Sequence, residues 1–221
     1  MCNLYSVTSN QEAIRDWARV MNDSTGNLPP MPGVFPDYAA PIVRNQPEGR
    51  ELASVRWGMP TPPKYLVGKK TDPGVTNIRN VNSAHWRRWL GIENRCVVPF
   101  TSFSENEALP DGTRPPIWFA LNETRPLAFF AGIWTPKWTS VRKLKEGEVT
   151  TDLFGFLTTE PNSLIAPIHN RMLVVLDKAD WPVWLGEQPG DPTLLLRPPP
   201  ADVLQCRPLG EREARSQRSL L

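Results

Sequence analysis

Proline limits the fold of this chain more than any other residue, because 25 of its 221 residues are proline, about twice the usual share. Proline lacks a backbone N–H and interrupts helices and central strands. The prolines gather in residues 28–36, 60–63 and 196–200, which we predict to be irregular connections. The chain is therefore expected to fold from many short elements.

Between these connections, the sequence predicts more strands than helices. Segments rich in β-branched and aromatic residues predict five strands, at residues 95–103, 117–121, 127–134, 153–158 and 171–176. Ser9, with Glu12 three residues later, predicts a capping box for a helix that ends near Met21. Two further short helices are predicted, over residues 82–90 and 161–168.

The order of these elements shows no regular alternation of strand, helix and strand, which is typical of an α+β fold rather than a doubly wound one. We therefore expect a mostly antiparallel β core with flanking short helices. The stretch from Arg207 onward mixes charges with little apolar periodicity, so we expect it to be loosely ordered, within an irregular C-terminal tail over residues 191–221.

Composition excludes several classes of protein. Hydrophobic residues make up 40% and charged residues 22% of the chain, as in ordinary globular domains. The chain has no apolar run long enough to cross a bilayer and no N-terminal secretory signal. Its three cysteines, Cys2, Cys96 and Cys206, are widely spaced and predict reduced thiols in a cytoplasmic protein. With two histidines and no CxxC pair, no metal site and no cofactor are expected.

Positive charge is concentrated in one segment. Residues 55–92 carry seven basic side chains against the single acidic residue Asp72, a net charge of +6, while the whole chain has only +2. The basic residues are Arg56, Lys64, Lys69, Lys70, Arg79, Arg87 and Arg88. Such a segment is typical of a phosphate-binding surface, although a well-solvated face has the same charge.

Cys2 directly follows the initiator methionine. Because its side chain is small, we expect methionine aminopeptidase to remove Met1 and leave an α-amine and a thiol on adjacent carbons. The amine of such an aminothiol forms an imine with an aldehyde, and the thiol then closes a thiazolidine ring. The alternative is that Cys2 is an ordinary small buried residue.

Several separated motifs resemble one protein family. They are "MCNLYS" at the start, "WGMP" at Trp57, "TNIRN" around Asn77, "RCVVPFTSFSEN" ending at Asn106, "FAGIW" and "LIAPIHNRMLVVL" around His169. In this order and spacing the chain resembles the SRAP family, the SOS response-associated peptidases or abasic-site processing proteins. The resemblance implies one SRAP-like domain over residues 2–190, with a positively charged cleft for single-stranded DNA that contains abasic sites.

The resemblance also implies the catalytic residues. Cys2 would form a covalent thiazolidine with the aldehyde of the abasic site. Glu105 matches the family's glutamate and would act as general acid and base, and His169 would deliver a proton when the sugar ring opens. Asn77 would hold the amine or a sugar hydroxyl in place. Read without the family, Glu105 is a surface carboxylate, Asn77 a turn residue and His169 a core or loop histidine bonded to backbone.

Arg79 and Arg87 fall where the family has phosphate-contacting arginines, and a guanidinium group can hold phosphate through two hydrogen bonds. Arg88 and Lys64 add diffuse attraction. One departure is local: where the family often reads "GFYEW", this chain reads "SFSEN", which places Asn106 at the position of the tryptophan.

Neighbouring side chains in the basic segment have other predicted roles. Trp86, Trp89 and Leu90 have helical spacing and are expected in the core rather than as stacking platforms for bases. His85 is predicted to be an exposed helical residue, and Cys96 and Cys206 to be structural.

Three functions remain open at this point. The first is an enzyme-like sensor of DNA damage that crosslinks to abasic sites as a monomer in the cytoplasm, associated with the nucleoid in a bacterium. The second is an N-terminal-nucleophile hydrolase in which the Cys2 thiolate attacks an amide, of which self-removal of Met1 would be a limited form. The third is a single-stranded DNA-binding module that is held by charge alone.

Overall fold

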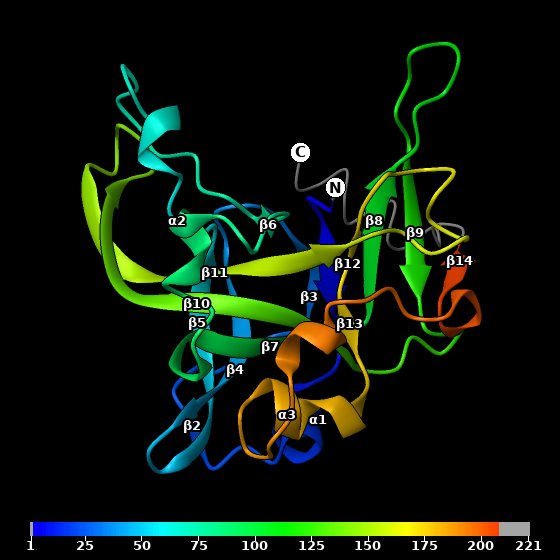
Figure 1. The fold of residues 1–221 in the computed structure, drawn as a ribbon, viewed down its shortest axis with the longest axis horizontal. Coiled ribbons are helices and arrows are strands. Elements are labelled where there is room, and N and C mark those ends of the chain that lie inside the picture. The colour runs from blue at the N-terminus through cyan, green and yellow to red at the C-terminus, as the bar shows by residue number, and fades with distance from the viewer. Residues whose placement is uncertain (1, 208–221) are drawn as a thin grey trace.

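The structure, a computed structural model, describes residues 2–207. Within this range strands dominate and helices are short (Figure 1). One sheet has the strand order β14-β9-β8-β1-β3, with antiparallel pairing throughout. Its strands are β1 (Tyr5–Val7), β3 (Met31–Val34), β8 (Ser102–Asn106), β9 (Pro116–Ala120) and β14 (Gln205–Arg207).

The second sheet closes into a barrel. Its order is β12-β11-β10-β7-β4-β5-β2, and β5 also pairs in parallel with β11, so that β11, β10, β7, β4 and β5 form a ring. The short strands β13 and β6 pair with β10 and β11. The strands are β2 (Asn22–Asp23), β4 (Ala39–Gln46), β5 (Gly49–Trp57), β6 (Asn77–Ile78), β7 (Arg95–Phe100), β10 (Ala128–Val141), β11 (Glu148–Thr159), β12 (Met172–Leu173) and β13 (Val175–Leu176).

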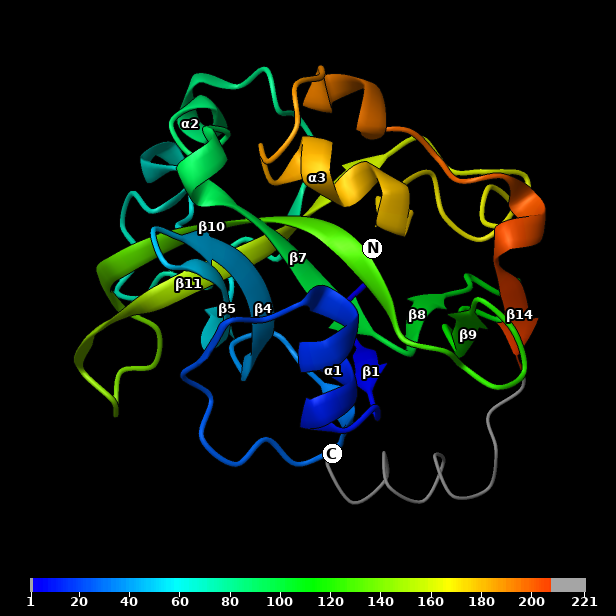
Figure 2. The ribbon, with the colours of Figure 1, turned by 90° about the horizontal axis from the view of Figure 1, so that it is seen from below.

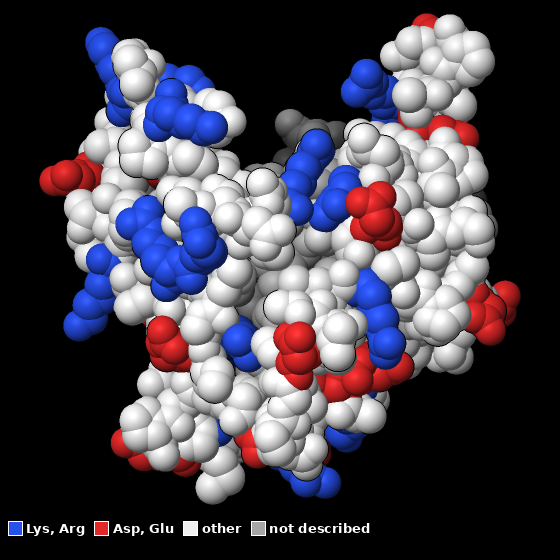
Figure 3. All heavy atoms as spheres, viewed as in Figure 1, with Lys and Arg blue, Asp and Glu red and all other residues white. Residues whose placement is uncertain are grey.

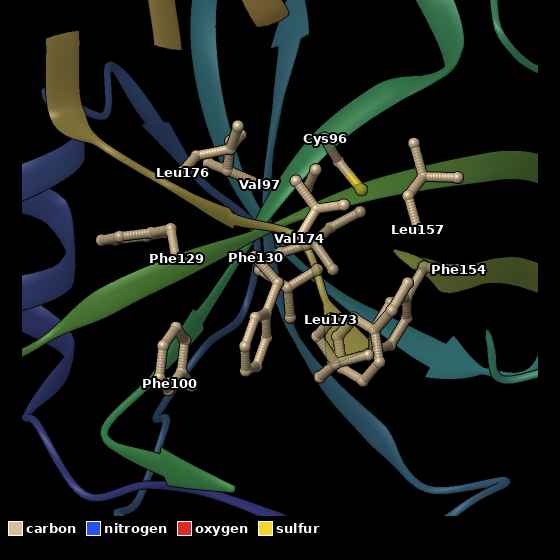
Figure 4. Close-up of a cluster of buried hydrophobic side chains, with 14 of the residues drawn as sticks. Cys96, Val97, Phe100, Phe129, Phe130, Phe154, Leu157, Leu173, Val174 and Leu176 are labelled. Atoms are coloured by element: carbon tan, nitrogen blue, oxygen red, sulfur yellow. The ribbon is translucent and has the colours of Figure 1, made fainter. Parts of the chain in front are cut away.

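Aromatic and aliphatic side chains from the two sheets fill one core, and Figure 4 shows a part of it that is supplied by strands of the second sheet. The ring of Phe130 stacks on that of Phe100 with 3.8 Å between centroids. Tyr5, from β1, contacts Trp57 and Phe156 edge to face. Burying one such side chain stabilises the fold by roughly 1.5–3 kcal/mol, so the start of the chain is anchored to the barrel.

The longest helix, α1 (Gln11–Ala18), begins differently from the prediction. Its N-cap is Asn10 rather than Ser9, and the Asn10 side chain accepts a hydrogen bond of 2.7 Å from the Ala13 backbone N–H. The helix ends before Met21 because Arg19 adopts a left-handed conformation. Helix α1 lies near the lower end of the molecule in Figure 1 and is seen from below in Figure 2.

The remaining helical segments are single turns. They are α2 (Ala84–Arg87), α3 (Trp181–Trp184) and the 3₁₀ turns η1 (Pro63–Tyr65), η2 (Ile92–Asn94), η3 (Lys178–Asp180), η4 (Pro192–Leu195) and η5 (Ala201–Val203). No helix within residues 2–207 is long and apolar enough to span a membrane.

The predicted α+β class is confirmed. The strands predicted at 117–121, 127–134 and 153–158 are present with changed limits, while the segments 95–103 and 171–176 are each divided into two strands. The helix predicted over residues 161–168 is wrong. That segment consists of turns, in which the Asn162 side chain accepts from the backbone N–H of Ile165. One proline-rich connection contains β3, and the hairpin of β4 and β5 was not predicted at all.

Side-chain predictions in the basic segment gave mixed results. Trp86 and Trp89 are buried in the core as predicted, and Leu90 is partly buried against it. The prediction for His85 is wrong: it is half-buried, its ring lies 4.4 Å from that of Trp86, and its Nε2 lies 2.9 Å from the Pro60 carbonyl oxygen. Cys96 is a buried free thiol, and Cys206 an exposed one.

The predicted tail falls partly outside the described residues, which end at 207. The described part contains η4, η5 and β14, and β14 pairs with β9. The loose order expected from Arg207 onward concerns residues that lie almost wholly outside the described range, so the tail and its boundary at residue 190 stay predictions.

Candidate functional site

Pairing between β1 and β8 carries the start of the chain into the interior. Tyr5 pairs with Phe103, and the Ser104 backbone N–H donates a 2.9 Å hydrogen bond to the Leu4 carbonyl. Cys2 consequently has no exposed surface, and its thiol lies 3.4 Å from the Leu4 carbonyl oxygen. The same register places Glu105, one residue beyond Ser104, beside Cys2.

Glu105 is a carboxyl group inside the protein, with only 1% of its surface exposed. Burial raises its pKa, and the Cys2 backbone N–H and the positive charge of Arg79 lower it in part. Glu105 in turn affects Cys2. Burial and the charge of Glu105 raise the pKa of the Cys2 thiol, which is therefore neutral in this environment. The nitrogen of Cys2 thus lies within hydrogen-bonding reach of a carboxyl group that binds protons more tightly than usual.

Asn77 contacts Cys2 from a strand of the second sheet. It belongs to β6, which pairs in parallel with β11 at Phe156. Its Nδ2 donates to the Cys2 carbonyl at 2.9 Å and to the Thr76 hydroxyl at 2.8 Å. Its Oδ1 is buried and accepts no hydrogen bond from any of residues 2–207. This oxygen can therefore accept a hydrogen bond from an amine or hydroxyl group that enters the site.

His169 is a half-buried residue that follows the turns after β11. The backbone N–H and the carbonyl oxygen of Arg171 both lie 3.0 Å from its Nδ1, so Nδ1 accepts from the N–H in one neutral tautomer and donates to the carbonyl in the other. Burial lowers the pKa of His169, and the positive charge of Arg79 lowers it further. These effects outweigh the hydrogen bond with Arg171, which raises the pKa in part, so the neutral imidazole is favoured at neutral pH.

Arg171 is a site residue that the sequence interpretation missed. Its Nη2 donates to the carbonyl oxygens of Thr158, at 2.6 Å, and Arg79, at 3.1 Å, while Nη1 pairs with Glu160 at 3.1 Å. The side chain thereby connects the ends of β6 and β11 to the segment of His169. Its place two residues after His169 in the "HNR" motif was the signal that could have identified it.

The two predicted DNA-binding arginines lie in different places. Arg79 directly follows β6, is exposed, and is close enough to Glu105 and His169 to affect the pKa of both. Arg87 is an exposed residue of α2 and has no described contact with the residues around Cys2. The structure therefore brings Cys2, Asn77, Glu105, His169 and Arg79 together and leaves Arg87 on the outer surface.

A groove of about 590 Å³ opens from Asn77 and Arg79 toward α2 and η1. Tyr65 lines it with 57% of its surface exposed, and the Lys64 ammonium group lies 4.8 Å from the centre of its ring. Figure 3 shows a hollow surface between the η1 segment and the β8–β9 hairpin, with basic side chains around it. We call the groove lined by Asn77, Arg79 and Tyr65 the first groove. It could hold an anionic chain that carries flat rings.

Among residues 2–207, no group of three or more His, Cys, Asp and Glu side chains is placed to hold a metal ion. Asn106, at the position where the resemblance has tryptophan, is the exposed last residue of β8. Glu105, the residue before it, lies in β8, which pairs with β1.

Comparison with known proteins adds independent information. The chain is similar to the abasic site processing proteins YoqW and YobE of Bacillus subtilis, with 28% and 29% identity over 82% of this chain and 79% and 81% of theirs. A solved protein structure from Bordetella bronchiseptica matches with a TM-score of 0.69 and 24% identity, covering 94% of this chain and 100% of that one. One from Bacteroides thetaiotaomicron matches with a TM-score of 0.67 and 19% identity, covering 93% and 90%. These two structures support the fold alone.

The model of one family, described as SOS response associated peptidase, matches residues 1–213, which is nearly the whole chain. This match includes every residue gathered around Cys2 and extends past the described residues. The chain therefore belongs to the SRAP family.

Proposed function

We propose that this protein captures abasic sites in single-stranded DNA covalently, as part of the response to DNA damage. The observation that carries the proposal is the position of Cys2, whose backbone N–H is hydrogen-bonded to Glu105 and whose carbonyl oxygen accepts a hydrogen bond from Asn77. The names of the relatives, abasic site processing proteins, support the same substrate.

The chemistry begins when Met1 is removed and the Cys2 nitrogen becomes an α-amine. Glu105 accepts the ammonium proton, and the neutral amine adds to the aldehyde carbon of the open-chain sugar. Loss of one water molecule gives an imine, to which the protonated Glu105 can return a proton. The thiol then adds to the imine carbon and its proton moves to the nitrogen, which closes the thiazolidine. The net reaction joins protein and DNA and releases one water molecule.

The other groups have supporting roles in this proposal. The neutral His169 imidazole, in the tautomer that carries its proton on Nε2, would donate to the sugar oxygen as the ring opens. The unpaired Oδ1 of Asn77 would accept a hydrogen bond from the amine or a sugar hydroxyl. Arg79, at the mouth of the first groove, would hold the phosphate next to the abasic sugar.

A second candidate activity is hydrolysis of the Met1–Cys2 peptide bond by the protein itself. It is favoured by the hydrogen bond between the Cys2 backbone N–H and Glu105. A carboxyl group with a raised pKa can donate a proton to the leaving nitrogen of that bond. The two activities are compatible, because the first requires the product of the second.

Intact-mass measurement tests the proposal. The purified protein is incubated with a single-stranded oligonucleotide that has one abasic site, and the mixture is denatured. We expect a species with the mass of protein plus oligonucleotide minus one water. Reduction of the aldehyde to an alcohol before mixing should prevent its formation. Reversible binding without this species would support the DNA-binding module instead, and turnover of an amide substrate would support the hydrolase.

A further inference from the structure

A second groove, of about 390 Å³, adjoins the first. Pro63 and His85 line both grooves, so that η1 and the His85 side chain form the ridge between them. Leu66 and Trp138 contribute apolar surface to the second groove, and Lys69, Lys70 and Arg88 contribute positive charge. We call this site the second groove. None of its residues takes part in the chemistry proposed above.

The positive charge of the second groove is not neutralised locally. Lys69, Lys70 and Arg88 are exposed and form no ion pair within residues 2–207. The one acidic residue that lines the groove, Asp72, is buried and accepts hydrogen bonds from the Thr61 hydroxyl and the Gly74 backbone N–H. The groove is therefore suited to an anionic ligand.

Aromatic rings and a guanidinium group are already stacked beside these lysines. The Arg88 guanidinium carbon lies 4.1 Å from the centre of the Trp89 ring and 5.8 Å from that of Trp138. The Arg88 Nη2 lies 3.3 Å from Nδ1 of His85, which further restricts its position. Trp89 is buried, whereas Trp138 is only partly buried. A partly exposed ring beside a guanidinium group is an arrangement on which unpaired nucleobases stack.

We propose that the second groove binds a nucleotide of the same DNA strand, at a distance from the abasic site, with its base against Trp138 and Arg88 and its phosphates beside Lys69 and Lys70. This inference rests on the proposed function. A strand that leaves Asn77 and Arg79 and passes η1 reaches the second groove, because the two grooves share the η1 ridge. Stacking on Trp138 requires an unpaired base, so the ligand is single-stranded.

The test compares short and long oligonucleotides that contain an abasic analogue without an aldehyde, so that only equilibrium binding is measured. The groove variants are Lys69→Gln with Lys70→Gln, and Trp138→Leu. The matched control, Lys137→Gln with Lys145→Gln, removes two charges from exposed residues of β10 and its hairpin that line neither groove. Fluorescence anisotropy against salt concentration gives affinity and the salt slope.

We expect the wild type to bind a 20-mer more tightly than a 5-mer centred on the abasic site. The double lysine variant should lose roughly tenfold in affinity for the 20-mer, with a salt slope smaller by about 1.4, because each single-strand phosphate contact contributes about 0.7. Trp138→Leu should lose roughly fivefold or more in affinity for the 20-mer. This loss should be absent when the nucleotides far from the abasic site are replaced by a sugar-phosphate chain without bases. Binding of the 5-mer should be the same in all variants.

Three results separate the possible failures. The first result concerns a wild type that crosslinks to natural abasic sites. If it binds the 20-mer no more tightly than the 5-mer, or if both groove variants keep the tighter binding of the 20-mer, the second groove does not bind DNA. If the wild type does not crosslink, but the groove variants lose the tighter binding of the 20-mer that the wild type shows, only the proposed covalent chemistry is wrong. If the variants bind poly-glutamate less tightly than the wild type and DNA equally well, the groove binds an acidic protein, which overturns the inference.

Discussion

The site around Cys2 and the surface around α2 use polar groups in opposite ways. Around Cys2 the ionisable groups are buried, fixed by strand pairing, and shifted in pKa by one another. Around α2 the cations are exposed and form no ion pairs within the described chain; they are Lys64, Lys69, Lys70, Arg87 and Arg88.

The rest of the barrel shows that unpaired cations are not the rule in this protein. Arg44 pairs with Glu51 and Asp152, and Arg56 pairs with Asp37, at 2.6–2.8 Å. Paired cations fix the structure, whereas unpaired ones remain available to a ligand. The comparison indicates that substitutions near Cys2 should change the rate of a reaction. Substitutions near α2 should instead change the affinity for DNA and the dependence of that affinity on salt.

The largest expected effect is at Cys2. Cys2→Ala should abolish crosslinking to abasic DNA, because ring closure requires the thiol, and any residue kept before Cys2 should have the same effect by blocking the amine. The exposed Cys206 provides a matched control, and Cys206→Ala should crosslink normally. Crosslinking at the wild-type rate by a protein with an N-terminal tag, seen on a denaturing gel, would contradict the aminothiol mechanism.

Glu105→Gln should slow crosslinking by about a hundredfold to ten-thousandfold, the usual contribution of general acid–base catalysis. Affinity for DNA should change little, since the buried carboxyl group faces Cys2 rather than the exposed cations. Single-turnover crosslinking measured beside equilibrium binding distinguishes the two effects. A strong loss of affinity with an unchanged saturated rate would place Glu105 in the DNA-binding surface.

The same variant should also change stability. Because burial raises the pKa of Glu105 above its ordinary value of 4.5, the folded protein favours the protonated form and loses stability as the pH rises through the raised pKa. Gln cannot ionise, so Glu105→Gln should have a higher Tm than the wild type at pH 8, and the difference should vanish near pH 4. Thermal unfolding at both pH values measures the difference in Tm. Equal Tm values at pH 8 would show that ionisation of Glu105 does not destabilise the folded protein.

His169→Ala should slow the reaction by about a hundredfold, at the lower end of the range for proton transfer. Because the pKa of His169 is lowered, the wild-type rate should depend on pH below neutrality, where the ring becomes protonated, and the variant should lack this dependence. The pH profile of the single-turnover rate is the measurement. A profile with the same shape in both proteins would exclude His169 as the group that titrates.

Arg79→Ala tests the boundary between the two regions. Arg79 is exposed like the outer cations, but its charge lowers the pKa of both Glu105 and His169. Its removal should weaken DNA binding roughly threefold through one lost phosphate contact and move the pH profile of the rate toward higher pH. An unchanged profile would mean that Arg79 serves affinity alone.

Arg87→Ala should have the smallest effect. We expect a salt slope lower by about 0.7 and a modest loss of affinity, without any change in the pH profile, because Arg87 has no described contact with the residues around Cys2. Lys145→Ala, at an exposed cation of the β10–β11 hairpin, is the control. If the two variants have the same salt slope, the DNA does not pass α2.

The sequence predicted the fold class correctly, whereas its catalytic residues stay predictions. Cys2, Asn77 and Glu105 were proposed from motifs of a few residues each, and the fold brings these three residues together. Arg171 was missed because its role depends on carbonyl groups of β6 and β11, whose proximity no local pattern reveals. The second groove was missed for the same reason, since Lys69 and Trp138 become neighbours only in the folded chain.

The β4–β5 hairpin shows where local patterns fail. Pro41 lies inside β4, although proline predicts a break, and β5 mixes charged and small residues. These strands exist because β4 pairs with β7 and β5 closes the ring against β11, which is a long-range effect. The opposite error occurred at residues 161–168, where an Asn162 side-chain bond forms a turn instead of starting a helix.

The complete burial of Cys2 has a consequence for the timing of synthesis. A folded chain offers no access to the Cys2 nitrogen for an aminopeptidase, so Met1 must leave earlier or by self-cleavage. At a translation rate of about 5–20 residues per second, Cys2 is made roughly 5–20 s before Glu105, the partner that helps to enclose it. During that interval the nascent chain cannot yet cover its own end. If an aminopeptidase removes Met1, the speed of the ribosome between these two codons limits the fraction of molecules with a free Cys2 amine; if the protein cleaves itself, that fraction is independent of the speed.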